Sequence, residues 1–383
     1  MPALAGKTYL NYGGQGPLPD PSLDAMVASW RTIQELGPFS TAVWPFIDRE
    51  LSRLRGLLAS RCGVRPSRVA FTENVTSGCV LPLWGLPWEP GDTILISDAE
   101  HPGVVAACHE LASREGLHIT SLPVTRWRGG LDEQADTDQQ VLGALEEALT
   151  ANTRLVVLSH LLWNTGQVMP IAAVAERLAE HPRQPWLLVD AAQSMGSLPV
   201  AAAASQSDIY AFTGHKWCCG PEGLGAVVLS ERLLSQARPT LIGWRSLRDE
   251  QAANEGFHED GRRFEVATSC TPLFSGLRTS LELLDSQGAC DERSRRIQQL
   301  SGQLWQALAR TDGLQPLLSG PPPAGLVSFR VEGREPPAVA RRLGEQGIWL
   351  RHLDHPSCLR ACTHITTTQE DLDRLLSALT AML

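Results

Sequence analysis

Short apolar runs alternate with longer amphipathic stretches through the first two thirds of the chain. The apolar runs lie at 93–97, 154–162, 185–193, 208–215 and 224–230. Short, continuous runs of this kind are typical of strands buried on both faces of a parallel sheet. Segments with helical spacing, such as 102–116 and 171–181, lie between them. This alternation predicts a large, doubly wound α/β layer with a mostly parallel central sheet.

The pattern changes near residues 245–260, which are polar and contain few apolar side chains. Beyond them the chain has helical patterns around 274–286 and 289–311, a strand at 325–333, a helix at 336–347, a strand at 348–353 and a closing helix at 368–383. This order predicts a small α+β domain. We therefore divide the chain into a large α/β domain, residues 16–250, and a small α+β domain made of residues 1–15 and 251–383.

Composition and charge exclude several classes of protein. The 383 residues are 43% hydrophobic and 20% charged, with a formal net charge of −9. Binding to nucleic acid or to a membrane surface needs clustered Lys and Arg, so we expect neither partner. No stretch approaches the ~18 apolar residues of a membrane span, and the first residues lack the features of a signal peptide. The nine scattered cysteines, with no CxxC pair, favour a reducing, cytoplasmic location.

The segment AFTGHKWCCGPEGLGAVVLS, residues 211–230, contains the most informative lysine. A strand pattern ends at Thr213, His215 and Lys216 follow, and the next loop is rich in glycine. A lone lysine here could be a solvated loop cation. The hydroxyl and imidazole groups before it suit a phosphate, however, and the glycines allow a close backbone approach. This pattern favours a lysine that holds pyridoxal phosphate as a Schiff base.

A pyridoxal site also needs a carboxylate beside the pyridine nitrogen and a group that binds the phosphate. Asp190 ends the strand pattern WLLVD, at the edge where open α/β sheets bind ligands. It could alternatively cap a helix. Gln193 follows and could reach the phenolate oxygen of the ring. Residues 74–77 open a helix whose first N–H groups suit a phosphate, although such caps are common.

Six short segments in register carry a family resemblance: TENVTSG, DAEHPG, WNTG, VDAAQS, TGHKW and a late pair of arginines. From about residue 8 to its C-terminus the chain resembles the class V aminotransferases, which include the cysteine desulfurases. The resemblance implies the fold type I of pyridoxal-phosphate-dependent transferases. Within the group, SHLLWNTGQVMPI, GWRS and RRFEVATS are most similar to the cyanobacterial cysteine/cystine C–S lyases. That family uses pyridoxal phosphate for β-elimination from L-cystine or L-cysteine, which yields pyruvate, ammonia and a persulfide or sulfide.

The resemblance implies roles around the cofactor. Lys216 is expected to carry it and to act as the base at Cα, while His101 stacks on its ring. Asp190 is expected to hold the pyridinium and Gln193 the phenolate oxygen. The groups expected to hold the phosphate are Val75, Thr76, Thr213, His215 and, from a second subunit, Thr268.

The resemblance also implies a substrate site. Arg351, Arg360 and Asn164 match the group that holds the substrate carboxylate, and Trp244 is expected near the substrate. The arginine fork recognises a carboxylate bidentately, which favours an amino acid as substrate. The role of Thr268 implies a homodimer with shared active sites.

Cysteine desulfurases, which share the fold and the cofactor, are the strongest alternative. In that family a protein cysteine on a mobile loop attacks the substrate sulfur, and alanine is the product. Cys358 lies two residues before Arg360 in a short segment, which is a poor place for a mobile nucleophile. A class V aminotransferase and a selenocysteine lyase also fit the motifs.

One segment is dense in metal-ligating residue types: His352, His355, Cys358, Cys362 and His364. Such density is typical of a zinc site. The usual ligand spacings are absent, and the two arginines in the same segment would repel a cation, so we predict no metal. A degenerate binding or scaffold protein is disfavoured because the lysine and the acid are both present. The sequence leaves open cystine against cysteine or another β-substituted amino acid, and the sulfur acceptor, for which iron–sulfur cluster supply is a family-level expectation.

Overall fold

The computed structural model of the protein describes residues 4–383, and its large sheet has seven strands in the order β2-β8-β7-β6-β5-β3-β4. The strands are β2 (Val69–Thr72), β3 (Thr93–Ser97), β4 (His118–Leu122), β5 (Thr153–Val157), β6 (Trp186–Asp190), β7 (Ile209–Thr213) and β8 (Gly225–Leu229). Strands β7, β6, β5, β3 and β4 are parallel to one another, and β8 is antiparallel to both β7 and β2. The mostly parallel central sheet is confirmed.

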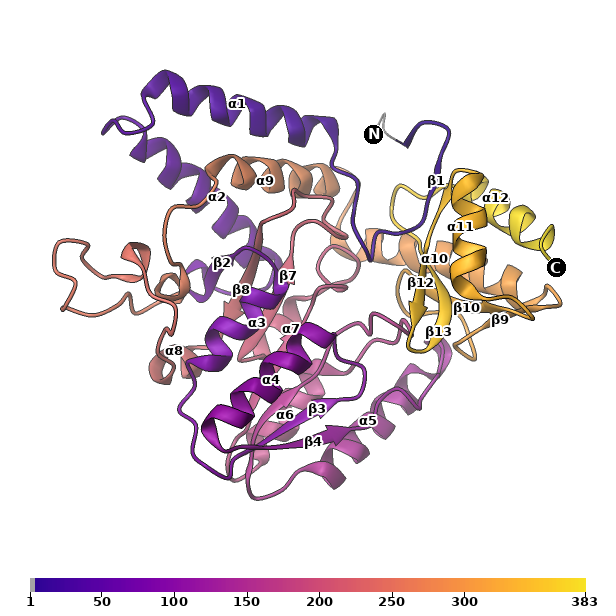
Figure 1. Cartoon of the computed structure of the whole chain (residues 1–383), viewed down its shortest axis with the longest axis horizontal. Coiled ribbons are helices and arrows are strands. Elements are labelled where there is room, and N and C mark those ends of the chain that lie inside the picture. The colour runs from indigo at the N-terminus through magenta and orange to yellow at the C-terminus, as the bar shows by residue number, and fades with distance from the viewer. Residues whose placement is uncertain (1–3) are drawn as a thin grey trace.

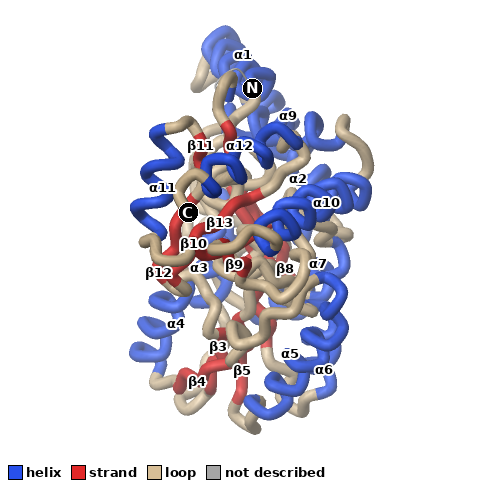
Figure 2. The backbone as a smooth tube through the Cα atoms, turned by 90° about the vertical axis from the view of Figure 1, so that its right-hand side faces the viewer, coloured by secondary structure: helices blue, strands red, loops and turns tan. Residues whose placement is uncertain are grey.

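Helices cover both faces of this sheet, because alternate strand residues enter two separate cores. Leu95, Val156 and Val189 pack in the core that includes α5 (Gln134–Ala148), α6 (Ile171–Glu180) and α7 (Ala201–Gln206). Their neighbours, such as Ile94 and Leu188, pack in the core that includes α3 (Val75–Trp84), α4 (Pro102–Glu115) and α8 (Glu231–Gln236). Figure 2 shows α4 on one side of the strands and α5 and α6 on the other. The doubly wound arrangement is confirmed.

Two further helices, α2 (Trp44–Arg61) and α9 (Thr271–Asp285), extend the first of these cores, and α1 (Asp20–Leu36) packs against α9. Helix α9 lies beside α1 and α2 (Figure 1). Its apolar face, which includes Phe274 and Leu277, joins Leu51 and Leu54 of α2 in the core. The division of the chain at residue 250 stays a prediction, and α9 packs with the elements on the earlier side of that boundary.

The C-terminal third forms a second α+β layer (orange to yellow in Figure 1) around a four-stranded antiparallel sheet of order β12-β13-β10-β9. Its elements are α10 (Cys290–Ala309), β9 (Leu314–Pro316), β10 (Leu326–Val331), α11 (Pro336–Glu345), β11 (Ile348–Trp349), β12 (Arg351–Asp354), β13 (Ser357–Cys362) and α12 (Gln369–Thr380). Strand β1 (Thr8–Tyr9) pairs with β11, so the N-terminal segment joins this layer. Residues 1–3 of that segment lie outside the described residues.

Two differences from the sequence-based expectation have a clear physical cause. The single strand expected at 348–353 is two strands, because Ile348 and Trp349 pair with β1 whereas Arg351 begins a hairpin with β13. Strand β4 was not predicted. It lies at the edge of the large sheet, and four of its five residues are exposed or half-buried, so it has no continuous apolar run.

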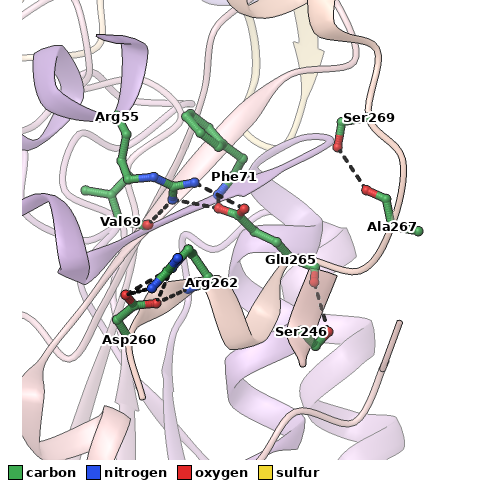
Figure 3. A network of polar contacts seen from close by, with 9 residues as sticks. All are labelled: Arg55, Val69, Phe71, Ser246, Asp260, Arg262, Glu265, Ala267 and Ser269. Carbon is green, nitrogen blue, oxygen red and sulfur yellow. Dashed lines mark hydrogen bonds and ion pairs between the residues drawn. The ribbon is translucent and has the colours of Figure 1, made fainter. Parts of the chain in front are cut away.

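The polar excursion at 245–260 contains little regular structure, yet a buried ion pair anchors the chain directly after it (Figure 3). Arg55 of α2 binds Glu265 through two hydrogen bonds of 2.6 and 3.1 Å. Glu265 also accepts the backbone N–H of Phe71 at 3.0 Å, and Arg55 donates to the carbonyl of Val69 at 2.6 Å. The pair therefore ties α2, β2 and residues 261–269 together.

We expect Glu265→Gln to lower the free energy of unfolding by about 3 kcal/mol, because it leaves Arg55 buried without its countercharge. Urea unfolding followed by circular dichroism measures this loss. Glu110→Gln is the matched control, since it breaks the exposed Arg114–Glu110 pair, which contributes only about 0.5 kcal/mol. Equal losses in the two variants would contradict a structural role for the buried pair.

Candidate active site

The carboxyl ends of the parallel strands deliver the predicted site residues to one cavity. Asp190 is the last residue of β6, Lys216 follows β7 by three residues, and His101 follows β3 as the N-cap of α4. The cavity has a volume of about 270 Å³. It is lined by Gly13, Asn74, Val75, Thr76, His101, Ser159, Leu161, Trp163, Asp190, Ala192, Gln193, His215, Lys216, Arg351 and Arg360. Residues far apart in the sequence thus meet where an open α/β sheet binds its ligands.

One end of the cavity is suited to a phosphate. Helix α3 begins there at Val75, with Asn74 as its N-cap accepting the Ser77 N–H at 3.0 Å. The first N–H groups of a helix have no partner within the helix, and its N-terminus carries a partial positive charge. Val75 and Thr76, which line the cavity, belong to this first turn. Thr213, the last residue of β7, is buried and hydrogen-bonds His215 at 2.6 Å.

Lys216 is the amine of the cavity. Burial lowers its pKa to about 8, with Arg360 and Arg351 adding to the effect and Asp190 opposing it. The turn that carries it is held by the N-terminal segment, because Gly16 donates its N–H to the carbonyl of His215 at 2.7 Å. A Cβ on Gly16 would lie 2.0 Å from the carbonyl oxygen of Lys216, so only glycine fits. With a pKa of about 8, roughly a tenth of the amine is neutral and nucleophilic at pH 7 and about half at pH 8.

Two arginines from neighbouring strands line the same cavity. Arg351 of β12 lies directly opposite Arg360 of β13 in the antiparallel register, which places both side chains on one face of the sheet. Arg360 is 1% exposed, and its Nη1 donates to the carbonyl of Trp163 at 2.7 Å. Its Nε and Nη2 have no hydrogen-bond partner among the described residues, although the Cys362 thiol lies beside the guanidinium. Two like charges in this arrangement call for an anion, and the guanidinium fork suits a carboxylate.

His101 closes one side of the cavity. Its Nδ1 accepts the Gly103 N–H at 3.2 Å, and its ring contacts Trp163 edge-on at 6.0 Å between centroids. Trp163 is itself fixed by its indole N–H, which donates to the carbonyl of Ala99 at 2.9 Å. Burial lowers the pKa of His101, which keeps the ring neutral and suits it to stacking on an aromatic ligand.

Four predicted residues do not line this cavity within one chain: Thr213 at the end of β7, Asn164, Thr268 and Trp244. Asn164 is buried beside it, where its side-chain oxygen accepts the Thr165 N–H. Thr268 is exposed in a separate hollow between β2 and α9, and its predicted partner is a second subunit. Trp244 lies in a larger, open hollow of about 860 Å³, edge-on to Trp44. Its predicted place near the substrate stays a prediction.

Some cavity residues were not singled out by the sequence pattern. Ser159 lines the wall, and behind it the buried Glu100 accepts the Ser159 N–H at 2.7 Å and its hydroxyl at 2.8 Å. Burial raises the pKa of Glu100 to about 7. Gly13 enters the cavity from the N-terminal segment. The sequence offers one signal for Glu100, which is its position directly before His101.

The dense His and Cys segment forms no metal site within residues 4–383, where no group of three or more His, Cys, Asp or Glu side chains is placed to hold an ion. Cys358 is buried, and His364 is stacked on Tyr12 with its Nε2 at 3.2 Å from the Trp217 carbonyl. No helix in the described part of the chain has the length and apolar character needed to cross a membrane.

The residues of the cavity fit pyridoxal phosphate. A buried carboxylate, Asp190, lies at a strand end for the pyridine nitrogen, and the amine of Lys216 is available for the aldehyde. The free N–H groups at the start of α3 suit the phosphate. The unpartnered side of Arg360 remains for the carboxylate of an amino acid. The donor set therefore matches the cofactor and an amino-acid substrate together.

Comparisons with known proteins identify the family of the chain. The family model of the class V aminotransferases matches residues 47–375. Isopenicillin N epimerase of Amycolatopsis lactamdurans is 30% identical, over 97% of this chain and 94% of that protein. A probable cysteine desulfurase of Pseudomonas aeruginosa is also 30% identical, over 98% and 94%.

Solved structures give the same family. The cystine C–S lyase C-DES, in complex with its reaction product cysteine persulfide, is 42% identical, with a TM-score of 0.93 over 99% of this chain and 98% of that one. A variant of C-DES with glycine covalently linked to its PLP cofactor is also 42% identical, with a TM-score of 0.91 over 99% and 97%. The family model matches most of the chain, and the solved structures share its fold over nearly the whole length: the protein belongs to the class V aminotransferase family.

Proposed function

We propose that the protein is a pyridoxal-phosphate-dependent carbon–sulfur lyase that acts on L-cystine, with L-cysteine as a related substrate. The reaction with cystine is a β-elimination: cystine and water give pyruvate, ammonium and cysteine persulfide. The similarity in sequence and fold to C-DES, whose structure holds cysteine persulfide as its product, carries this proposal. The cavity supports it, because an amine (Lys216), a carboxylate (Asp190) and a buried guanidinium (Arg360) meet there in one chain.

Bound pyridoxal phosphate supplies a protonated pyridine ring that takes up the electron pair left at Cα when a proton is removed. Asp190 stabilises that positive charge on the ring nitrogen, and the N-terminus of α3 binds the phosphate. Arg360 binds the substrate carboxylate and so orients the Cα–H bond. The amine of Lys216 takes the proton from Cα, and its lowered pKa of about 8 suits it to this exchange near neutral pH. The persulfide leaves as a stable anion.

The rate at which pyridoxal phosphate binds covalently to the apoenzyme is expected to rise about tenfold per pH unit up to pH 8 and then to level off. Only the neutral amine of Lys216 attacks the aldehyde, and burial lowers its pKa to about 8. The amine is therefore an ammonium ion below that pH and free above it. Growth of the visible absorbance band after mixing measures the rate. A rate that still rises above pH 9 would indicate an ordinary, solvated lysine.

A cysteine desulfurase remains the alternative, and Cys358 decides between the two reactions. The structure places Cys358 inside strand β13 and fully buried. Burial raises the pKa of its thiol to about 11, so the thiol is not ionised near neutral pH. An attacking nucleophile must be ionised and mobile, and a buried residue within a strand is neither. These features favour the lyase.

We expect Cys358→Ser to form pyruvate from cystine within about twofold of the wild-type rate, because an inert thiol takes no part in the reaction. Pyruvate and alanine are measured together after addition of cystine or cysteine. Cys362→Ser is the matched control for replacing a buried cysteine on this strand. Cys362 is as buried as Cys358 but lies beside the guanidinium of Arg360. Loss of sulfur release in Cys358→Ser, with alanine as the wild-type product from cysteine, would support the desulfurase.

We further propose a homodimer in which Thr268 reaches the phosphate of the partner subunit. Thr268 is exposed, and the nearby Leu241 and Ile242 are 54% and 52% exposed, which suits an interface. Analytical ultracentrifugation tests the dimer.

A cytoplasmic location also stays a proposal, supported by nine free cysteines.

A further inference from the structure

We propose that Trp217 and Gly13 are positioning residues that fix the orientation of the Gln193 side-chain amide, so that Gln193 presents an N–H to the phenolate oxygen of the cofactor. The inference rests on the proposed cofactor site. It adds two groups outside the reacting atoms, one from the turn after Lys216 and one from the N-terminal segment.

The chemistry of the two partners determines which way the amide lies. The indole N–H of Trp217 donates to Oε1 of Gln193 at 2.8 Å, and Nε2 of Gln193 donates to the carbonyl of Gly13 at 2.9 Å. An indole can only donate and a carbonyl can only accept. The flipped amide would therefore place donor against donor and acceptor against acceptor, so both contacts select the same orientation.

Trp217 is held rigidly in place. It is fully buried, and its carbonyl lies 3.2 Å from Nε2 of His364, whose ring stacks on Tyr12 at 4.2 Å. The chain leaves room for it with two glycines. A Cβ on Gly325 would lie 2.8 Å from the indole ring, and one on Gly196 would lie 2.8 Å from the carbonyl carbon of Trp217. The indole N–H is therefore a fixed donor.

Gly13 supplies the second contact at a crowded crossing. Its N–H donates to the thiol of Cys362 at 3.3 Å. A Cβ on Gly13 would lie 2.8 Å from Oε1 of Gln193 and 3.0 Å from Nη2 of Arg360. Only glycine lets the N-terminal segment pass between the amide and the guanidinium, and this close passage brings its carbonyl to Gln193.

The fixed amide has one N–H to spare. Nε2 carries two hydrogens, of which Gly13 takes one, and no other acceptor within residues 4–383 takes the second. Gln193 lines the same cavity as Lys216 and Asp190. A donor held at the phenolate oxygen stabilises the negative charge there and weakens the hold of that oxygen on the proton it shares with the Lys216 nitrogen.

The test is a spectral pH titration of the visible band of the holoenzyme. We expect Trp217→Phe, which keeps the aromatic bulk but loses the N–H, to raise the midpoint by about one pH unit. Gln193→Met should raise it in the same direction. The double variant should shift it no further than Gln193→Met alone, because Trp217 acts through Gln193. An unchanged midpoint in Trp217→Phe, or additive shifts, would overturn the inference.

Trp186→Phe is the matched control. Trp186 is also buried, but its indole N–H has no hydrogen-bond partner in the described chain, so we expect the midpoint to stay unchanged. An equal shift in this control would mean that any buried indole has the effect, which overturns the inference. A wild-type protein with no visible band after addition of pyridoxal phosphate would overturn the proposed function itself, and the inference with it.

A second measurement applies if Trp217→Phe does not fold. The indole nitrogens of the eleven tryptophans can be labelled with ¹⁵N and compared by NMR in wild-type and Gln193→Met holoenzyme. We expect one indole N–H signal to move and to exchange faster with solvent once its acceptor is gone. Identical indole spectra would overturn the inference.

Discussion

Lys216→Ala is expected to lose the visible cofactor band and at least about 10⁴-fold of the rate of pyruvate formation. The variant removes both the amine that binds the aldehyde and the base that takes the Cα proton. Few residues could carry the cofactor in place of Lys216, because the sequence contains only two lysines, Lys7 and Lys216. Arginine does not form a stable Schiff base, so the other basic side chains offer no substitute. Absorbance and a coupled pyruvate assay measure the two losses.

Lys7→Arg is the matched control for this prediction. Lys7 is exposed in the N-terminal segment, so its replacement should leave both the band and the rate unchanged. Borohydride reduction of the wild-type holoenzyme, followed by peptide mass spectrometry, should place the cofactor on the peptide that contains Lys216. A label on Lys7, or a visible band that persists in Lys216→Ala, would contradict the account.

Arg360→Met is expected to lower kcat/KM for cystine on the order of 10³-fold. The variant removes the buried positive charge that is proposed to bind the carboxylate of the substrate. The same variant should make the apoenzyme more stable, by about 1 kcal/mol. This gain arises because Arg360 is buried with two unpartnered nitrogens and has no carboxylate partner within the described chain. Steady-state kinetics and urea unfolding of the apoenzyme measure the two effects.

Arg293→Met separates this expectation from the general effect of burying an arginine. Arg293 is also buried, but its Nη1 lies 3.3 Å from the carboxylate of Asp285. Its removal should therefore lower stability and leave kcat/KM for cystine unchanged. If Arg360→Met instead destabilises the apoenzyme as Arg293→Met does, Arg360 is a structural residue and the substrate carboxylate binds elsewhere.

The parts of the fold that were predicted correctly are those in which burial is continuous. The run at 93–97 coincides with β3, all five of whose residues are buried. The helical spacing at 171–181 corresponds to α6, whose buried residues Ile171, Val174 and Leu178 repeat at the helical period. The run at 154–162 was longer than β5, because the chain leaves the sheet after Val157 while its side chains stay buried. Burial alone does not mark where hydrogen-bonded pairing ends.

The site was predicted where a residue type and a strand end coincide, as at Asp190 and Lys216. Its other half depends on contacts between segments that lie far apart in the sequence. The pairing of Arg351 opposite Arg360 depends on the register of β12 and β13, and a shift of one residue would turn one of them to the other face. The contact of Gly13 with Gln193 spans 180 positions. Such contacts follow from the packing of the N-terminal segment between the two layers, which no local pattern shows.

The most direct test of the central claim is to mix the purified holoenzyme with L-cystine, and in a second sample with L-cysteine, without any thiol acceptor, and to measure pyruvate and alanine together in each. The account predicts a visible absorbance band before mixing, then pyruvate, ammonium and cysteine persulfide in equal amounts, with no alanine. Alanine formed from cysteine, without pyruvate from cystine, would assign the protein to the desulfurases and contradict the account.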